Sequence, residues 1–370
     1  MTVDVAILGG GLAGLACATL LSKAGATVQL LEKSSYPTHR VCGEYLSSEV
    51  EPFLQRLGLD PSALGAKRLT DFELTTRGGR RFACTLPGGG LGVSRFRLDA
   101  ALASVAESAG ASVRTRTAAL EVYPKRANFR IRTPTDCVEA RLVIGCFGKR
   151  STLDRTLGRP SFRRRSPYVA IKRHFRGPFP QNLVGLHSIP GGYCGISPVE
   201  NDLVNVCYMT QARVLKAMGS VRGFDSRGLG SNPLLSRYLD KLHSAFEPAM
   251  VISQLDFAAK PLVSNHVLML GDAAGSIHPL CGNGMAMGFR AANLLAPLAL
   301  AFLDGKLSRH ALEQRYQAAW KRAFTQRRLV GRLLQPLLES RAWSEGACAT
   351  AARFPVFTTQ LVRRTHGQPF

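Results

Sequence analysis

Three glycines and one glutamate near the start of the chain stand at the spacing that dinucleotide binding requires. Val3–Leu8 is an unbroken apolar run, which predicts a strand buried on both faces. This run is followed by a GxGxxG turn and then by a stretch with helical apolar spacing. A further apolar run comes next and leads directly into Glu32. The glycines of the turn are Gly9, Gly11 and Gly14. The pattern predicts a strand–turn–helix–strand unit that holds a dinucleotide.

Each residue of this motif has a physical role. Gly9 allows the tight turn, Gly11 lets the backbone approach a pyrophosphate, and Gly14 lets the helix press on the strand. The unpaired N–H groups of the helix then face the pyrophosphate, where the helix dipole favours negative charge. Glu32 can accept hydrogen bonds from ribose hydroxyls. The alternative is a glycine turn of purely structural use.

Another apolar run, Val267–Leu270, lies late in the chain and is also followed closely by a carboxylate, Asp272. A strand end of this kind can deliver the carboxylate to the hydroxyls of a polyol. A predicted helix then runs from Met285 to Leu303, kinked or broken near Pro297. Its N-terminus would present N–H groups to whatever lies beyond it. The residues of this second motif are Gly271, Asp272, Pro279, Gly282, Asn283, Gly284 and Met285. For Asp272 the alternative is a helix N-cap or turn former.

Together these motifs resemble the FAD-dependent oxidoreductases of the para-hydroxybenzoate hydroxylase fold. A third match is Val93–Leu102, which fits that family's V-x-R-x-x-L-D-x-x-L pattern. The matches span about residues 1–160 and 255–300. The resemblance implies that Glu32 binds the adenosine ribose, that Asp272 binds the ribityl side of FAD, and that Arg95 lies near the cofactor.

Two shorter segments resemble the geranylgeranyl reductase-like group of that superfamily. Arg40–Glu44 contains the Cys-Gly pair that faces the flavin in the group, and this makes Cys42 a candidate catalytic residue. Gly192–Pro198 resembles the strand that lies over the substrate cavity, and this makes Tyr193 a second candidate. The alternatives are a buried thiol for Cys42 and core packing for Tyr193.

The chain also departs from the family pattern. Phe147 stands where the family has the acid of an Asp-Gly pair, which puts NAD(P)H-driven hydroxylation in doubt. The W-x-W-x-I-P motif of flavin-dependent halogenases is absent from the sequence, so halogenation is not expected. A second GxGxxG is also absent. Electrons are therefore expected from transiently docked NAD(P)H or from a protein electron donor.

The predicted fold is α/β, with a Rossmann-like FAD domain and an antiparallel-sheet substrate domain. Leu69–Leu86 and Tyr123–Arg132 read as hairpins, and alternating runs fill residues 168–209. We expect a discontinuous FAD domain made of residues 1–68, 92–160 and 255–330. Residues 69–91 and 161–254 would form the substrate domain, and residues 331–370 a basic helical segment.

The net charge of +23 is unusual for an enzyme and is unevenly spread. Residues 155–199 hold eight Lys/Arg and no acidic residue, and residues 304–370 hold twelve Lys/Arg against four Asp/Glu. Such a charge attracts anionic lipid or an acidic carrier protein, whereas nucleic acid is not expected because no recognised motif accompanies it. The alternative is a solvated basic surface.

The cysteines and the apolar runs bear on the cellular location. Nine scattered cysteines without a CxxC pair indicate a reducing cytoplasm and no metal site. Neither a signal peptide nor a membrane-spanning run is expected. We therefore expect a cytoplasmic protein with possible peripheral contact to an anionic membrane.

Three functional hypotheses follow. The first is reduction, or the reverse desaturation, of a carbon–carbon bond in a hydrophobic anionic substrate such as a prenyl lipid, a polyketide or a carrier-bound acyl group. The second is monooxygenation of an aromatic or polyketide through a flavin C4a-hydroperoxide. The third is a flavin-bearing binding module for a membrane surface or carrier protein. The fold serves both reactions, so it cannot choose between them.

Overall fold

A mainly parallel sheet, sheet A, forms one half of the molecule. The computed structural model describes residues 2–125, 128–159, 165–255, 257–276, 282–354 and 367–370. The strand order of sheet A is β16-β17-β9-β1-β2-β6, with β7 and β8 continuing beside β9. Its strands are β1 (Thr2–Leu8), β2 (Val28–Leu31), β6 (Ser112–Arg114), β7 (Glu121–Lys125), β8 (Asn128–Arg132), β9 (Cys137–Gly145), β16 (Val263–Ser264) and β17 (Val267–Met269). The predicted Rossmann-like parallel sheet is thus confirmed.

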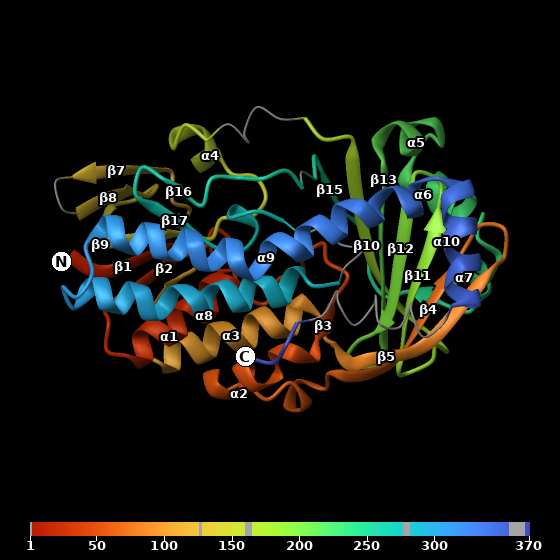
Figure 1. The fold of residues 1–370 in the computed structure, drawn as a ribbon, viewed down its shortest axis with the longest axis horizontal. Helices are drawn as coiled ribbons and strands as arrows, with labels where there is room; N and C mark the ends of the chain where they lie inside the picture. Colours follow the sequence, from red (N-terminus) through yellow and green to blue (C-terminus); the bar gives the residue numbers. More distant parts are fainter. Residues whose placement is uncertain (1, 126–127, 160–164, 256, 277–281, 355–366) are drawn as a thin grey trace.

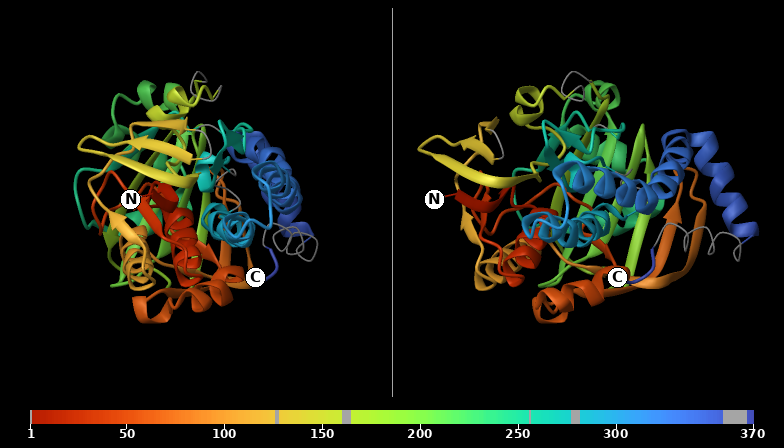
Figure 2. Two further views of the ribbon diagram at one scale, coloured as in Figure 1. Left: turned by 90° about the vertical axis from the view of Figure 1, so that its left-hand side faces the viewer. Right: turned by 60° about the vertical axis from the view of Figure 1, so that its left-hand side comes forward.

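Four helices pack beside sheet A in the same half of the molecule (Figure 1). They are α1 (Leu12–Lys23), α3 (Arg95–Ser108), α8 (Gly284–Leu303) and α9 (Arg309–Glu339). Figure 2 shows α8 and α9 lying side by side, and α9 continues past the end of α8 towards the other half of the molecule. The strands and helices share one large apolar core, in which Leu15, Phe289 and Tyr316 are fully buried.

A mostly antiparallel sheet, sheet B, forms the other half. Its strand order is β14-β10-β13-β12-β11-β4-β5-β3, and β15 also pairs with β10. The strands are β3 (Tyr45–Ser47), β4 (Lys67–Thr75), β5 (Arg81–Gly92), β10 (Tyr168–Arg176), β11 (Leu183–Ile189), β12 (Gly192–Pro198), β13 (Leu203–Gln211), β14 (His243–Ser244) and β15 (Met250–Ser253). The expected antiparallel sheet is confirmed, although β11 pairs with β4 in parallel.

Short helices connect and cover these layers. They are η1 (Ser48–Val50), α2 (Glu51–Leu57), η2 (Ser62–Leu64), α4 (Thr152–Thr156), α5 (Ala212–Ala217), α6 (Val221–Phe224), η4 (Asp225–Leu229), α7 (Pro233–Leu239) and η5 (Gly271–Ala273). The last described helix, α10 (Arg341–Arg353), packs on β5 in sheet B. Both predicted hairpins are present, as β4–β5 and β7–β8. The domain boundaries stay a prediction, and β3 from the first predicted FAD segment pairs with β5.

Helix α8 bears on two expectations from the sequence. It continues through Pro297, so the helix is not broken there, while a kink at this position stays a prediction. It is also long and apolar enough to cross a membrane by length and composition, although half of it is buried inside the protein. Because it packs against both α1 and α9, its apolar character is that of a core helix.

Candidate cofactor and substrate site

The carboxyl ends of four parallel strands meet at one edge of sheet A. Leu8 in β1 is in register with Leu31 in β2 and with Gly145 in β9, and Gly145 is in register with Met269 in β17. The residues that follow these strand ends are therefore brought to the same edge: Gly9, Glu32, Cys146 and the Gly271–Asp272 pair. Both motifs found in the sequence thus contribute to one site, at the edge where open α/β sheets bind ligands.

The GxGxxG turn is closed so tightly that two of its positions admit only glycine. Gly9 has a left-handed φ of +112°, and a Cβ there would lie 2.4 Å from the carbonyl oxygen of Cys146. A Cβ on Gly14 would lie 2.2 Å from the carbonyl oxygen of Gly9. At Gly11, by contrast, the atom nearest to an ideal Cβ is the Arg95 guanidinium, 3.9 Å away. The turn is therefore packed on the protein side and open beside Gly11.

Arg95 lies beside this open position as a fixed cation. Its guanidinium donates to both carboxylate oxygens of Asp99, at 2.6 and 2.7 Å, and Asp99 is fully buried. Burial alone would lower the pKa of Arg95, but the paired Asp99 carboxylate outweighs it and raises the pKa. This bidentate pair is a strong, oriented one. The predicted cofactor-binding Arg95 is thus held next to the glycine turn.

Glu32 is buried and already accepts three hydrogen bonds. One carboxylate oxygen accepts from the N–H of Gly10 at 2.7 Å. The other accepts from the N–H of Ser34 at 2.9 Å and from Arg40 at 3.1 Å. Burial would raise the pKa of Glu32, but Arg40 and the two N–H groups outweigh it, so the pKa is lowered. The ionised carboxylate therefore keeps acceptor capacity for a ribose hydroxyl at neutral pH.

The second motif lies on the first turn of α1. A Cβ on Gly271 would lie 3.2 Å from the Cβ of Ala13, and one on Gly288 in α8 would lie 3.5 Å from the same atom. The Asp272 side chain is 41% exposed and accepts a hydrogen bond from Ser276 at 2.9 Å. Its other oxygen is 3.9 Å from the Lys149 ammonium. Asp272 is thus available to a ligand beside the glycine turn.

Helix α8 begins at Gly284, within the second motif. Asn283 precedes the helix and is buried, and Met285 is buried in the main core. Apart from its chain neighbours and the backbone of its own helix, no heavy atom of the described residues lies within 4 Å of an ideal Cβ on Gly284. At Gly282, however, an ideal Cβ would lie 2.8 Å from the ring of Tyr45. The predicted cofactor-binding residue Pro279 lies outside the described residues.

Phe147, which stands where the family has an acid, lies close to a buried ion pair. The Phe147 ring lies 5.8 Å from the Arg159 guanidinium. Arg159 is paired with Asp154 at 2.6 Å and donates to the carbonyl oxygen of Ala273 at 2.6 Å, within the second motif. Burial lowers the pKa of Arg159 in spite of Asp154. The charge of Arg159 is therefore balanced by Asp154, and Arg159 ties the chain after α4 to the second motif.

Tyr193 lies on an apolar face of sheet B. It is in register with Met209 in β13, which is in register with Ala170 in β10, so the three side chains share one face. These residues and Leu255 form a buried cluster, against which Val41 packs. Val41 belongs to the Arg40–Glu44 segment, so that segment lies beside the Tyr193 face. The structure thus brings the two candidate catalytic segments together.

Cys42 is half-buried and is tied to the same sheet. Its carbonyl oxygen accepts a hydrogen bond from the Asn205 amide in β13 at 3.2 Å. Its Sγ atom accepts from the N–H of Glu44 at 3.4 Å. The catalytic roles of Cys42 and Tyr193 stay predictions, but both residues lie where sheet B meets the Arg40–Glu44 segment.

Sequence reasoning missed a cluster of three ionisable residues next to Cys42. The Glu44 carboxylate accepts from the Lys172 ammonium and pairs with Nε2 of His174 at 2.6 Å. All three side chains are buried, Lys172 and Glu44 fully so. Lys172 and His174 sit two residues apart on the face of β10 that also carries Ala170. Because β10 also contains Arg173 and Arg176, its local pattern does not mark Lys172 and His174 as buried.

Comparison with known proteins places the chain among flavoproteins. The family model described as "FAD binding domain" matches residues 2–327. Menaquinone reductase from Mycobacterium tuberculosis is 28% identical over 320 residues, which is 80% of this chain and 76% of that protein. Digeranylgeranylglycerophospholipid reductase 1 from Methanothermobacter thermautotrophicus is 26% identical over 81% of this chain and 77% of that protein.

A solved structure supports the fold over almost the whole chain. The myxobacterial chondrochloren halogenase CndH, an FAD-dependent halogenase, superposes with a TM-score of 0.79 and 18% identity, covering 97% of this chain and 90% of that chain. At this level of identity the likeness shows a shared fold, and the fold alone hosts several reactions.

Proposed function

This chain belongs to the FAD binding domain family and is an FAD-dependent oxidoreductase, and we propose that it reduces a carbon–carbon double bond in a hydrophobic, isoprenoid-type substrate. The observation that carries the proposal is the apolar face of sheet B around Tyr193, which ends beside the cofactor edge at the Arg40–Glu44 segment. The names of the curated relatives support it, since one reduces menaquinone and another a digeranylgeranyl phospholipid.

The residues at the sheet A edge fit FAD. The backbone is open beside Gly11 and Gly284, the first residues of α1 and α8 lie against each other through Ala13, and Arg95 supplies a fixed positive charge. Glu32 would hold the adenosine ribose and Asp272 the ribityl chain. FAD supplies the two electrons of the reduction when it is bound there.

The protein's own contribution is to bind and orient the substrate and to exclude water. The side chains of Ala170, Tyr193 and Met209 belong to one buried apolar cluster. We propose that this cluster forms the wall against which a hydrocarbon chain binds. Reduction of a double bond adds two electrons and two protons, and FAD alone does not replenish the electrons. We propose NAD(P)H or a protein electron donor as the reductant.

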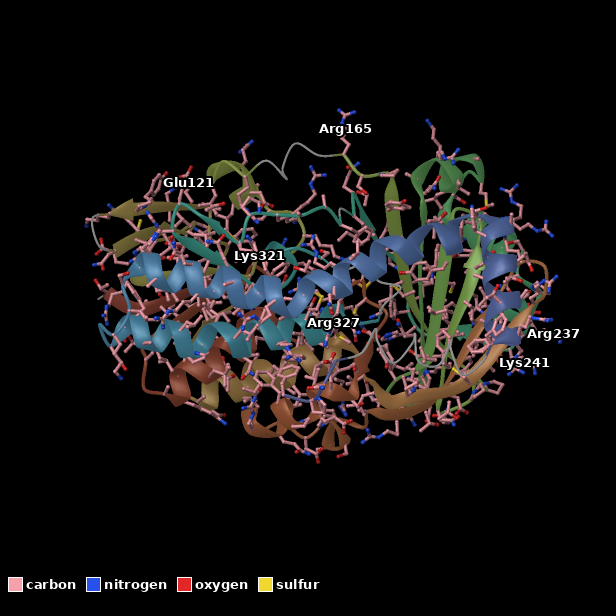
Figure 3. The ribbon with its side chains drawn as sticks, viewed as in Figure 1. Glu121, Arg165, Arg237, Lys241, Lys321 and Arg327 are labelled. Carbon is pink, nitrogen blue, oxygen red and sulfur yellow. The ribbon has the colours of Figure 1, made fainter. Side chains whose placement is uncertain are left out.

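The positive charge of the protein supports a substrate whose polar end is anionic or is attached to an anionic carrier. The net charge is +23, and Figure 3 shows Arg165, Arg237 and Lys241 pointing outward from the sheet B half. A positive surface concentrates anionic lipids or an acidic carrier protein near the site. We therefore propose a hydrophobic substrate that is anionic or bound to an anionic carrier.

Analysis of the products tests the reaction. The FAD-loaded protein is reduced with dithionite, freed of excess dithionite, mixed without oxygen with a geranylgeranyl phospholipid, and the lipid is extracted for mass spectrometry. The expected product has gained two hydrogen atoms and no oxygen. A parallel reaction under ¹⁸O₂ identifies a monooxygenase. A product that appears only with oxygen and carries the label would contradict reduction.

A further inference from the structure

A buried carboxylate holds the segment that joins the two halves of the site. The Glu44 carboxylate accepts from three donors: the Lys172 ammonium, His174 Nε2 at 2.6 Å, and the N–H of Arg95 at 2.7 Å. Lys172 and His174 come from β10 in sheet B, and Arg95 begins α3 beside the GxGxxG turn. Glu44 thus connects sheet B with the cofactor edge of sheet A.

The other end of this short segment is fixed to the predicted ribose-binding carboxylate. Arg40 pairs with Glu32 at 3.1 Å and lies 3.9 Å from Asp99. Between the two ends, the carbonyl oxygen of Cys42 accepts from Asn205 in β13. The Arg40–Glu44 segment is therefore held at three points. Arg40 is held by Glu32, Cys42 by Asn205, and Glu44 by its own partners.

Stability alone is a poor explanation for such an arrangement. Removing an ammonium and a carboxylate from water costs free energy that their mutual attraction often fails to recover, and apolar side chains of similar volume frequently give equal or greater stability. Glu44 also adopts a left-handed backbone conformation with φ of 55°. A non-glycine residue keeps such a conformation when its surroundings over-determine it, and this is common at functional sites.

We propose that Glu44 is the positioning residue of the site: held by Lys172 and His174, it fixes the Arg40–Glu44 segment so that Cys42 lies between the FAD edge and the Tyr193 face. Because Arg40 connects the same segment to Glu32, FAD binding and the placement of Cys42 are coupled. This role goes beyond the proposed reaction and holds for whichever substrate the protein reduces.

The reactivity of the Cys42 thiol reports the placement directly. Iodoacetamide labelling is followed by peptide mass spectrometry in the full-length protein, with the exposed Cys137 as the internal reference. Glu44→Gln and Lys172→Met are expected to increase the Cys42 labelling rate about tenfold or more, because the segment opens locally. Glu49→Gln is the matched control: Glu49 is also buried and pairs with Arg327 at 3.0 Å. It is expected to lower the melting temperature without changing Cys42 labelling.

Two further measurements separate positioning from stability. The double variant Glu44→Gln/Lys172→Met removes both buried charges, so its melting temperature is expected to recover while Cys42 labelling stays fast. Bound FAD is expected to slow Cys42 labelling in the natural protein and to slow it much less in Glu44→Gln. The proposal is overturned if Glu44→Gln labels at the natural rate, or if labelling in the double variant returns to that rate.

Discussion

At the scale of single residues, the cofactor site depends on two carboxylates in opposite environments. Glu32 is buried and anchored by Gly10, Ser34 and Arg40, whereas Asp272 is 41% exposed. Substitution of Glu32 therefore disturbs its protein partners as well as the ligand, and substitution of Asp272 affects mainly the ligand.

Glu32→Gln is expected to weaken FAD binding about tenfold to a hundredfold, since a charge-assisted hydrogen bond contributes about 1.5–3 kcal/mol. The ionised form is the one that accepts from Gly10, Ser34 and Arg40. The measurement is the FAD dissociation constant from flavin fluorescence. Glu107→Gln, on the exposed side of α3, is the control and is expected to bind FAD normally. Unchanged affinity in Glu32→Gln would remove Glu32 from the ribose site.

Asp272→Ala is expected to lose bound FAD while the fold is largely kept, because the side chain packs against little of the protein. The ratio of flavin to protein absorbance and the melting temperature of the apoprotein measure the two effects separately. Asp304→Ala removes another exposed aspartate, which pairs with Lys306 away from the site, and should retain FAD. Full flavin occupancy in Asp272→Ala would show that the second motif does not hold the cofactor.

At the scale of elements, local patterns were predictable and long-range pairings were not. The unit β1–α1–β2 was predicted because its signals lie in one short, continuous stretch of the sequence. These signals are an apolar run, the GxGxxG turn and the terminal Glu32. The partners of Glu44 are 128 and 130 residues away and meet it only through the placement of β10. No local pattern marks such a pair, and the short strand β3 that follows Glu44 was missed for the same reason.

A second buried polar group predicts how the stability of sheet B depends on pH. His187 in β11 is fully buried, its Nδ1 is 2.6 Å from the Thr75 hydroxyl, and burial lowers its pKa to about 3. Because its unfolded pKa is near 6.5, the unfolded chain binds a proton below that pH and the folded protein does not. Folding stability is therefore lost as the pH falls below 6.5.

Between pH 6.5 and 5 the free energy of unfolding is expected to fall by about 1–2 kcal/mol through His187 alone, at most about 1.4 kcal/mol per pH unit. Urea unfolding at several pH values in the natural protein and in His187→Asn measures the difference, which cancels the contribution of the other histidines. If the free energy of unfolding changed with pH equally in the two proteins, His187 would titrate alike in the folded and unfolded states.

At the scale of the whole molecule, the basic charge coincides with exposed apolar side chains near the C-terminus. Leu329, Trp343 and Phe354 are each more than half exposed and lie on or next to α9 and α10. The same part of the chain is rich in arginine, including Arg341 and Arg353. Trp at a lipid interface combined with basic residues is the pattern of a membrane-surface site. The sequence predicted the charge, but exposure depends on how α10 packs on β5.

We therefore expect the protein to sediment with phosphatidylglycerol vesicles at low salt and to be released at high salt, because surface charge is screened within about 10 Å at 0.1 M salt. Trp343→Ala should weaken binding several-fold. Tyr123→Ala, which removes an exposed aromatic ring on β7, should not. Equal binding to neutral phosphatidylcholine vesicles, or equal loss in both variants, would exclude this surface.

The most direct test is the anaerobic reoxidation of the dithionite-reduced, FAD-loaded protein by a geranylgeranyl phospholipid, which has no quinone group, followed by flavin absorbance. We predict that the flavin is reoxidised at a rate that saturates with lipid concentration, and that Tyr193→Ala slows this reoxidation. A flavin that stays reduced with every isoprenoid lipid, and is reoxidised only when oxygen is admitted, would contradict the proposed reductase.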